Sequence, residues 1–503
     1  MNPIDRGARS RRALIRGAVL APLATAVGWG AWRLAFSPRP QPTLLSEGVV
    51  VGTGGVVRPL PPGASCRFEP GTRVPAADPA AAAEGGAGRA SLAGRTDDSA
   101  AATAAGGGVL SDEERTALVR AARERVAGAA LPGGRRAGAA RDALADLLAL
   151  IGPVLADADG SDPISYPAGA VVAGPVSAWR YVWPRDASFA AAALSAVGLD
   201  DEALTVLEHL AALQGVDGGF EARYTAAGTV PDDRLAQLDG TGWVMWAAGR
   251  VLGAARPDAD RVDADRPDVD RPDAARVDGR LGVCLRRCAS RLLELTDGPH
   301  RLPPVSPDYW EVAEGRLTLD TAMSVLLGLE AAARLVAAGL DLGAEGEATA
   351  ARAVQVRAAI EGGFAPGWGR HRGDDDVDAA IALTAPPFTA ALRGAVEVRR
   401  GARERMARVS GGVGPGSSWR DDGVSWTPET ALLAWSAAAL GAGGETGLAA
   451  EADELLDWLV DRRTGVGALP EKVAADGSPA GPAPLAWTCS LLLLALCESD
   501  RGR

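Results

Sequence analysis

Lysine and histidine are almost absent from this chain of 503 residues. The sequence contains one lysine, Lys472, and three scattered histidines, His209, His300 and His371. A Schiff-base or P-loop lysine has only one possible position, and no GxxxxGK[ST] motif surrounds it. Three isolated imidazoles argue against a histidine-rich metal site. Carboxylates must therefore carry any acid–base chemistry, and we expect neither a metal ion nor a cofactor.

A surplus of positive charge is also lacking. The formal net charge is −12 at pH 7, with 52 basic against 64 acidic residues. Nucleic acids and anionic membrane surfaces are bound chiefly through clustered basic residues. We therefore expect no nucleic-acid partner. The acidic balance is compatible with a neutral substrate such as a sugar. We also expect a monomer.

The five cysteines form no CxxC motif. Cys284 and Cys288 lie four residues apart in a helix-like stretch, so they share one face. Unpaired cysteines are among the most buried residue types. We interpret this pair as buried small apolar residues in preference to a disulfide or a ligand pair.

Residues 1–38 have the features of an export signal or membrane anchor. Several arginines precede an apolar run at about 17–32, and the stretch Ser10–Arg16 resembles a twin-arginine signal. The run is short for a membrane span, and it contains a small-residue cleavage site at Ala24–Ala26. We expect an exported protein, either extracellular or membrane-anchored with its bulk facing outside. Cleavage and retention both stay open.

Three further segments differ from the rest of the chain. Residues 39–73 contain two β-branched runs bounded by glycine, Gly48–Gly52 and Gly55–Arg58, which predict a small β-like strand pair. Residues 74–108 are rich in alanine and glycine and are typical of a flexible, disordered linker. The tract 256–280 repeats Asp-Arg-Pro/Val-Asp and predicts a low-complexity surface insertion.

The remainder, residues 109–503, is predicted to be all-α. Ser111 to Glu114 form a capping box, and Asp200 is a candidate cap for a helix that follows Gly198. Many of the later helices are apolar over most of their circumference, which is typical of the inner ring of a double-layered helical toroid. Their expected ranges are 242–252, 321–338, 428–440, 449–460 and 485–497.

Unusual polar and aromatic residues cluster just before these helices, in five motifs. The motifs are Trp179–Asp186, Gln237–Trp243, Pro307–Glu311, Trp419–Trp426, and Leu469–Glu471 with Pro484–Trp487. Each motif alone has an ordinary structural interpretation, such as a helix-end anchor, a structural ion pair or a carboxylate at a helix dipole. Together they indicate a site, because loops that precede the helices of a toroid converge on one end of the ring. Aromatic faces, charged hydrogen-bonding groups and two carboxylates are what glycosidic hydrolysis requires.

In this order, the motifs resemble the bacterial members of glycoside hydrolase family 15, the glucoamylase family. The resemblance runs from about residue 169 to the C-terminus. It implies an (α/α)6 barrel, a six-hairpin toroid, and an exo-acting, inverting enzyme that releases glucose from the non-reducing ends of α-glucans or α-glucosides. The substrate would accordingly be an oligo- or polysaccharide.

The resemblance also implies roles for individual residues. Glu311 matches the family's general acid and Glu471 its general base. Arg185 and Asp186 match the pair that holds the hydroxyls of the terminal glucose. The full set of implied substrate-binding residues is Trp183, Arg185, Asp186, Asp308, Trp310, Arg420 and Trp487.

An inverting reaction makes specific demands on the two glutamates. Glu311 would be protonated at rest, with Trp310 helping to exclude water from it, and Glu471 would be ionised. The two carboxyl groups would lie roughly 6.5–9.5 Å apart to admit a water molecule.

Some positions depart from the family's fungal members. Val312 replaces an acidic residue, Lys472 replaces a glutamine that often follows the base, and Trp179 replaces a tyrosine that supports the attacking water. These departures leave open a trehalase, isomaltase or glucodextranase specificity. A helical-toroid phosphorylase would need a phosphate site, which no glycine-rich or basic cluster supports. A non-catalytic envelope glycan-binding protein is a further alternative.

Overall fold

The computed structural model describes residues 41–77, 110–253, 277 and 279–502. The predicted export segment lies outside the described residues, as do most of the predicted linker and most of the predicted insertion. No helix in the described ranges is both long enough and apolar enough to cross a membrane. Residues Pro42–Arg503 form one compact unit.

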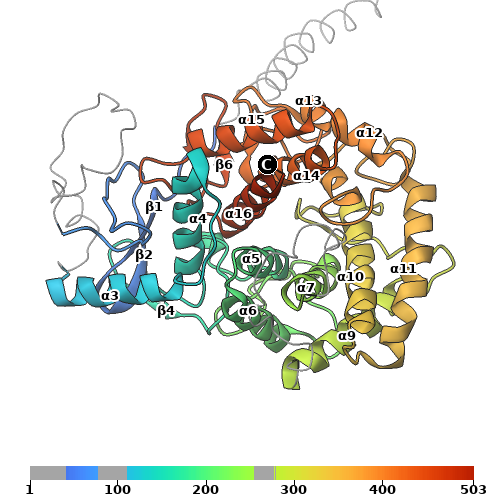
Figure 1. The fold of residues 1–503 in the computed structure, drawn as a ribbon, viewed down its shortest axis with the longest axis horizontal. Coiled ribbons are helices and arrows are strands. Elements are labelled where there is room, and N and C mark those ends of the chain that lie inside the picture. Colours follow the sequence, from blue (N-terminus) through green and yellow to red (C-terminus); the bar gives the residue numbers. More distant parts are fainter. Residues whose placement is uncertain (1–40, 78–109, 254–276, 278, 503) are drawn as a thin grey trace, which may run out of the picture. The chain divides into compact units, whose positions relative to one another are not determined.

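A ring of helices forms the centre of this unit (Figure 1). Its helices are buried along most of their length, because alanine and leucine occupy nearly every side of them. α16 contacts α5 and thereby closes the ring. In ring order the members are α5 (Pro184–Ala196), α7 (Asp239–Val251), α10 (Leu319–Ala337), the 3-10 segment η7 (Ala379–Thr384), α14 (Thr427–Ala442) and α16 (Ala486–Arg501).

A second layer of helices surrounds the first. Each inner member packs against an outer helix that is its neighbour in the chain, and α7 and α10 contact the outer helices on both sides of them. α16 packs against α4 as well as α15, so the two ends of the domain meet. The outer helices are α4 (Ala137–Ala149), α6 (Asp200–Leu213), α9 (Gly279–Leu295), α11 (Gly343–Phe364), α12 (Ala395–Arg400) and α15 (Leu448–Asp461). The predicted all-α class and its inner layer of apolar helices are confirmed.

One inner position departs from a regular helix. η7 has only six residues, and it begins with Asp378 accepting a hydrogen bond from the amide of Ala380 at 2.8 Å. Pro386 and Pro387 follow it after a single residue, Ala385. Proline has no amide hydrogen and cannot continue a helical hydrogen-bond ladder, so the segment stays short.

Helix boundaries agree with the predictions to within a few residues. Ser111 caps α3 (Asp112–Arg125) in the predicted capping box with Glu114. The prediction for Asp200 is wrong: Leu199 is the cap of α6 and Asp200 is the first helical residue. Its carboxylate instead accepts a hydrogen bond from the Ser195 hydroxyl at 2.6 Å. A short helix, α13 (Ala402–Met406), was not predicted.

The predicted strand pair is present. β1 (Gly48–Val51) and β2 (Val56–Leu60) are antiparallel, with Val50 opposite Arg58. The sheet extends through β3 (Val154–Leu155), which is parallel to β2, and β4 (Ile164–Ser165). A second sheet joins β5 (Ser425–Trp426), β6 (Lys472–Val473) and β7 (Pro479–Ala480). Residues 42–77 therefore pack on the helical part instead of standing apart from it.

The N-terminal segment is bonded to the last part of the chain. The Ser46 hydroxyl donates to the carbonyl of Ala483 at 2.7 Å, and the Leu45 amide donates to the carbonyl of Gly481 at 2.9 Å. The Thr464 hydroxyl donates to the carbonyl of Glu47. These bonds hold the loop between Glu471 and α16 in place.

Cys284 and Cys288 are both buried in α9, as expected for small apolar residues. The Gln214 side chain, just after α6, donates to the carbonyl of Cys284 and to the sulfur of Cys288.

Candidate active site

The first turns of the inner helices carry buried carboxylates. Asp186 lies in α5, Asp239 in α7, Asp320 in α10 and Glu429 in α14, and each is at least 95% buried. Burial raises the pKa of all four groups, because a carboxylate loses its hydration when it leaves water. Carboxylates at helix N-termini face the positive end of the helix dipole, which offsets part of that cost.

Direct contacts join the five predicted motifs into one site. Arg185 of the first motif hydrogen-bonds Gln237 and Asp239 of the second. Trp183 of the first motif contacts Glu311 of the third, and Trp179 contacts Glu471 of the fifth. The remaining motif is joined by ring contacts: Trp419 packs edge-on against Trp310 at 4.7 Å, and the Lys472 ammonium lies 4.1 Å from the ring centre of Trp426.

Glu311 ends a tight turn at the surface of the site. Its amide donates to the carbonyl of Asp308 at 2.8 Å, and its φ of 53° is unusual for a residue other than glycine. Such backbone conformations persist only where the surroundings hold them, and they concentrate at functional sites. One carboxylate oxygen accepts a 2.7 Å hydrogen bond from the Trp183 indole, and the other pairs with Arg234.

The environment of Glu311 differs from the expectation in one respect. Trp310 was expected to exclude water from Glu311. Its ring lies instead against the Arg370 guanidinium, 3.7 Å from the ring centre, with the edge of Trp419 beside it. Glu311 is exposed, with 26% of its side chain accessible.

Glu471 lies deeper, with 10% of its side chain accessible. Its carboxylate accepts a 3.3 Å hydrogen bond from the Trp179 indole and pairs with the Lys472 ammonium at 3.0 Å. Burial raises the pKa of Glu471, and the lysine charge and the indole donor both oppose that rise. The charge of Glu311 also contributes to the rise, which indicates that the two carboxylates face a common region.

Arg185 and Asp186 lie together at the start of α5. Their side chains are 3.7 Å apart, and the Arg185 guanidinium lies 5.0 Å from the ring centre of Trp487. Burial raises the pKa of Asp186 to about 7, although the Arg185 charge favours the ionised form. Asp186 is therefore a weaker acid than an exposed aspartate, despite its arginine neighbour.

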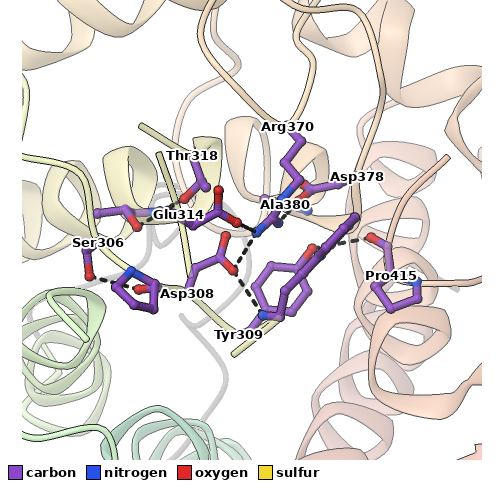
Figure 2. A network of polar contacts seen from close by, with 12 residues as sticks. Ser306, Asp308, Tyr309, Glu314, Thr318, Arg370, Asp378, Ala380 and Pro415 are labelled. Atoms are coloured by element: carbon purple, nitrogen blue, oxygen red, sulfur yellow. Dashed lines mark hydrogen bonds and ion pairs between the residues drawn. The ribbon is translucent and has the colours of Figure 1, made fainter. Parts of the chain in front are cut away.

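Asp308 supports the turn that carries Glu311. Figure 2 shows Asp308 in a buried network centred on Arg370. Arg370 contacts Asp308 at 2.8 Å, Glu314 at 2.6 Å and Asp378 at 2.7 Å. Asp308 was predicted to bind substrate, but its carboxylate is fully buried and also accepts from the Trp310 amide. These contacts hold the turn in place, and substrate binding by Asp308 stays a prediction.

Arg420 lies at the exposed edge of the site. Its guanidinium is 4.6 Å from the ring centre of Trp419, which in turn packs against Trp310 and Trp426. Substrate binding by Arg420 stays a prediction. Trp183 and Trp487 are mostly buried and form the inner walls.

Several buried polar atoms around Arg185 have no hydrogen-bond partner within the described part of the chain. They are Arg185 Nε, Asp186 Oδ2, Glu429 Oε2 and Trp487 Nε1. An unsatisfied buried polar group costs about 1–3 kcal/mol, so a native structure rarely leaves several together without a ligand to complete them. Two donors, an acceptor carboxylate and a carboxyl group gathered beside indole rings suit a ligand with several hydroxyl groups.

Comparison with solved structures places this arrangement in a known fold. A glycosidase variant solved in complex with glucose is 22% identical, with a TM-score of 0.53, and the match covers 72% of this chain and 96% of that one. The glucoamylase from Saccharomycopsis fibuligera is 16% identical, with a TM-score of 0.54 and coverages of 72% and 95%. A bacterial glucoamylase complexed with acarbose is 14% identical, with a TM-score of 0.53 and coverages of 78% and 62%.

The chain has the glucoamylase fold. No protein-family model matches the sequence, and no curated protein matches it. The likeness is therefore one of structure.

Three residues that the sequence did not indicate also contact the site or lie close to it. Arg234 pairs with Glu311, Arg370 organises the loop beneath it, and Glu429 lies near Glu471. Arg234 and Arg370 are ordinary arginines in the sequence, and only tertiary contacts give them a role. Glu429 had one available signal, a glutamate directly after Thr427-Pro428 at a helix start, but that pattern equally fits a solvated helix end.

Across the described ranges, no cluster of histidine, cysteine, aspartate or glutamate is arranged to hold a metal ion.

Proposed function

We propose that this protein is a glycoside hydrolase that releases glucose from the non-reducing end of an α-glucan or α-glucoside. The proposal rests on one observation: on a glucoamylase fold, the charge of Glu311 acts on both Glu471 and Asp186, and the Arg185–Asp186 pair carries two buried polar atoms, Arg185 Nε and Asp186 Oδ2, without hydrogen-bond partners in the described part of the chain. The Arg185–Asp186 pair would hold hydroxyls of the terminal sugar, which accounts for cutting at chain ends.

The proposed chemistry is inverting. Glu311 donates a proton to the leaving oxygen, while Glu471 takes a proton from water that attacks the opposite face of C1. Trp183 and Trp179 orient the two carboxylates through their indole N–H groups. The Arg234 contact occupies the second oxygen of Glu311, so this contact must open before a glycosidic oxygen can reach that atom.

The first prediction concerns the two glutamates. Glu311→Gln and Glu471→Gln should fold as the wild type does, and each should lower kcat by about 10²–10⁴-fold, the usual contribution of a general acid or base. Glu347→Gln, on the exposed surface of α11, is the matched control and should keep full activity. Full activity in either site variant would exclude the assignment.

Product analysis tests specificity and stereochemistry. Maltose, maltotriose, isomaltose, dextran and trehalose are incubated with the protein, and the anomer released first is followed by NMR. β-Glucose from maltose supports the proposal, and preference for trehalose or for α-1,6 linkages selects a trehalase, isomaltase or glucodextranase specificity. Saturable glucan binding without glucose release indicates a glycan-binding protein.

A further inference from the structure

Glu429 is a buried carboxyl group that the proposed reaction does not use. It lies in the first turn of α14 and is only 2% exposed. One of its carboxyl oxygens, Oε2, is buried and has no hydrogen-bond partner in the described part of the chain. A core position of this kind is normally apolar or fully hydrogen-bonded.

The backbone fixes Glu429 beside the segment that carries the proposed base. The Thr427 amide donates to the carbonyl of Glu471 at 3.1 Å, and the Thr427 hydroxyl donates to the carbonyl of Pro470 at 2.6 Å. Trp426 pairs with Lys472 across the β5–β6 ladder. The position of Glu429 is therefore set relative to Glu471 by contacts two and three residues away.

Three charged groups act on Glu429: Glu471 and Lys472 from the β6 side, and Arg185 from α5. The charges of both the proposed base and Arg185 therefore reach Glu429. Burial raises the pKa of Glu429 to about 8, so its carboxyl group is mainly protonated at neutral pH. A protonated carboxyl group has an O–H donor, which an ionised carboxylate lacks.

We propose that Glu429 is a specificity-determining residue whose unpartnered carboxyl oxygen hydrogen-bonds one hydroxyl of the sugar held by Arg185 and Asp186. This inference rests on the proposed function for the identity of the ligand. A neutral group is suited to this place because a second anion beside Glu471 would be repelled by it. The sugar hydroxyl supplies the hydrogen-bond partner that Oε2 lacks in the free protein.

Binding of small sugars tests the inference independently of hydrolysis. Dissociation constants for D-glucose and its 2-, 3-, 4- and 6-deoxy forms are measured by calorimetry with wild type, Glu429→Gln and Glu429→Leu. Glutamine keeps a neutral donor of the same shape, so Glu429→Gln should bind glucose within about 5-fold of wild type. Glu429→Leu should bind about 10- to 100-fold more weakly, since a buried hydroxyl is left without its partner.

The deoxy sugars identify the hydroxyl involved. One deoxy form should bind wild type about 10-fold or more below glucose, while Glu429→Leu no longer distinguishes it from glucose. Equal weakening of every sugar by Glu429→Leu would overturn the inference, since it indicates a general packing defect. Unchanged affinities in Glu429→Leu, or no glucose binding by wild type, would also overturn it. Glucose release from maltose, measured separately, reports on the proposed function, so the two failures are distinguishable.

Discussion

At the scale of single residues, Lys472 has the clearest effect on the site. It is the only lysine in the chain, and its ammonium contacts the carboxylate of Glu471 directly. Without that charge, burial alone would favour the protonated form of Glu471 and leave it unable to accept a proton from water. The Lys472 charge therefore offsets part of the rise in the pKa of Glu471 that burial causes.

Replacement of Lys472 should change the acidic limb of the pH–rate profile. In Lys472→Gln the pKa of Glu471 rises further, so a smaller fraction is ionised at low pH and the acidic limb of kcat/KM moves to higher pH. At the acidic end of the profile kcat/KM should fall about tenfold, which is less than the full contribution of a general base. Lys472→Arg keeps the charge and should keep the limb in place. An unchanged limb in Lys472→Gln would contradict the pairing.

The sequence predicted much of the site at this scale. Arg185, Asp186 and the two glutamates lie in motifs whose order alone suggested a common site, and contacts join those motifs. The sequence did not predict that Asp308 and Trp310 both contact the buried Arg370. Arg370 is 59 residues or more from the motif it supports, and no local pattern reveals such a partner.

At the scale of elements, the close approach of α7 and α10 depends on glycine. A Cβ added to Gly242 would lie 2.1 Å from the carbonyl oxygen of Ser324, and one added to Gly328 would lie 2.9 Å from the Cα of Gly242. The two backbones are therefore in near contact. The motif Gln237–Trp243 thus combines a polar loop with a helix-packing contact.

Gly242→Ala should be strongly destabilising. The new methyl group meets backbone atoms that cannot turn away, so we expect a loss of about 3 kcal/mol or more in the free energy of unfolding. Gly362→Ala, in α11 with open space around it, is the control and should stabilise by about 0.5–1 kcal/mol. Urea denaturation of both variants measures the difference. Equal stabilities would show that α7 and α10 separate easily.

Long helices were easier to predict from the sequence than short strands and 3-10 segments. The inner helices could be predicted because alanine and leucine occupy most of their positions, whereas α11 and α4 were not predicted. The strands β5, β6 and β7 have two residues each, and so short a run has no period. η7 occupies a helical position of the ring, and its length is decided by two following prolines and by its neighbours.

At the scale of the whole molecule, buried carboxylates make stability depend on pH. Burial raises the pKa of Asp186 to about 7 and that of Glu429 to about 8, well above their values in an unfolded chain. The unfolded state then releases protons between about pH 4 and 8 that the folded state keeps, so these groups lower stability as pH rises through this window. Below it, both states are protonated and the effect vanishes.

The free energy of unfolding should therefore fall as pH rises from 5 to 8. The expected size is about 1.4 kcal/mol for each unit by which a folded pKa exceeds its unfolded value, as an upper bound for each group. Glu429→Gln removes one titration and should flatten the slope, whereas the exposed Glu347→Gln should leave it unchanged. Denaturation at a series of pH values measures the slopes. The same slope in Glu429→Gln and wild type would contradict a raised pKa for Glu429.

The bonds between residues 45–47 and residues 464–483 also bear on how the protein is made. During synthesis the ribosome releases Ser46 and Glu47 more than 400 residues before their partners Ala483 and Thr464. Until then residues 45–47 lack these hydrogen-bond partners, and the inner ring lacks α16 to close it. The emerging chain must remain incompletely folded for most of its synthesis, with apolar ring helices exposed to aggregation. Chaperone demand during expression should therefore be high, and C-terminal truncation should affect the start of the chain as much as its end.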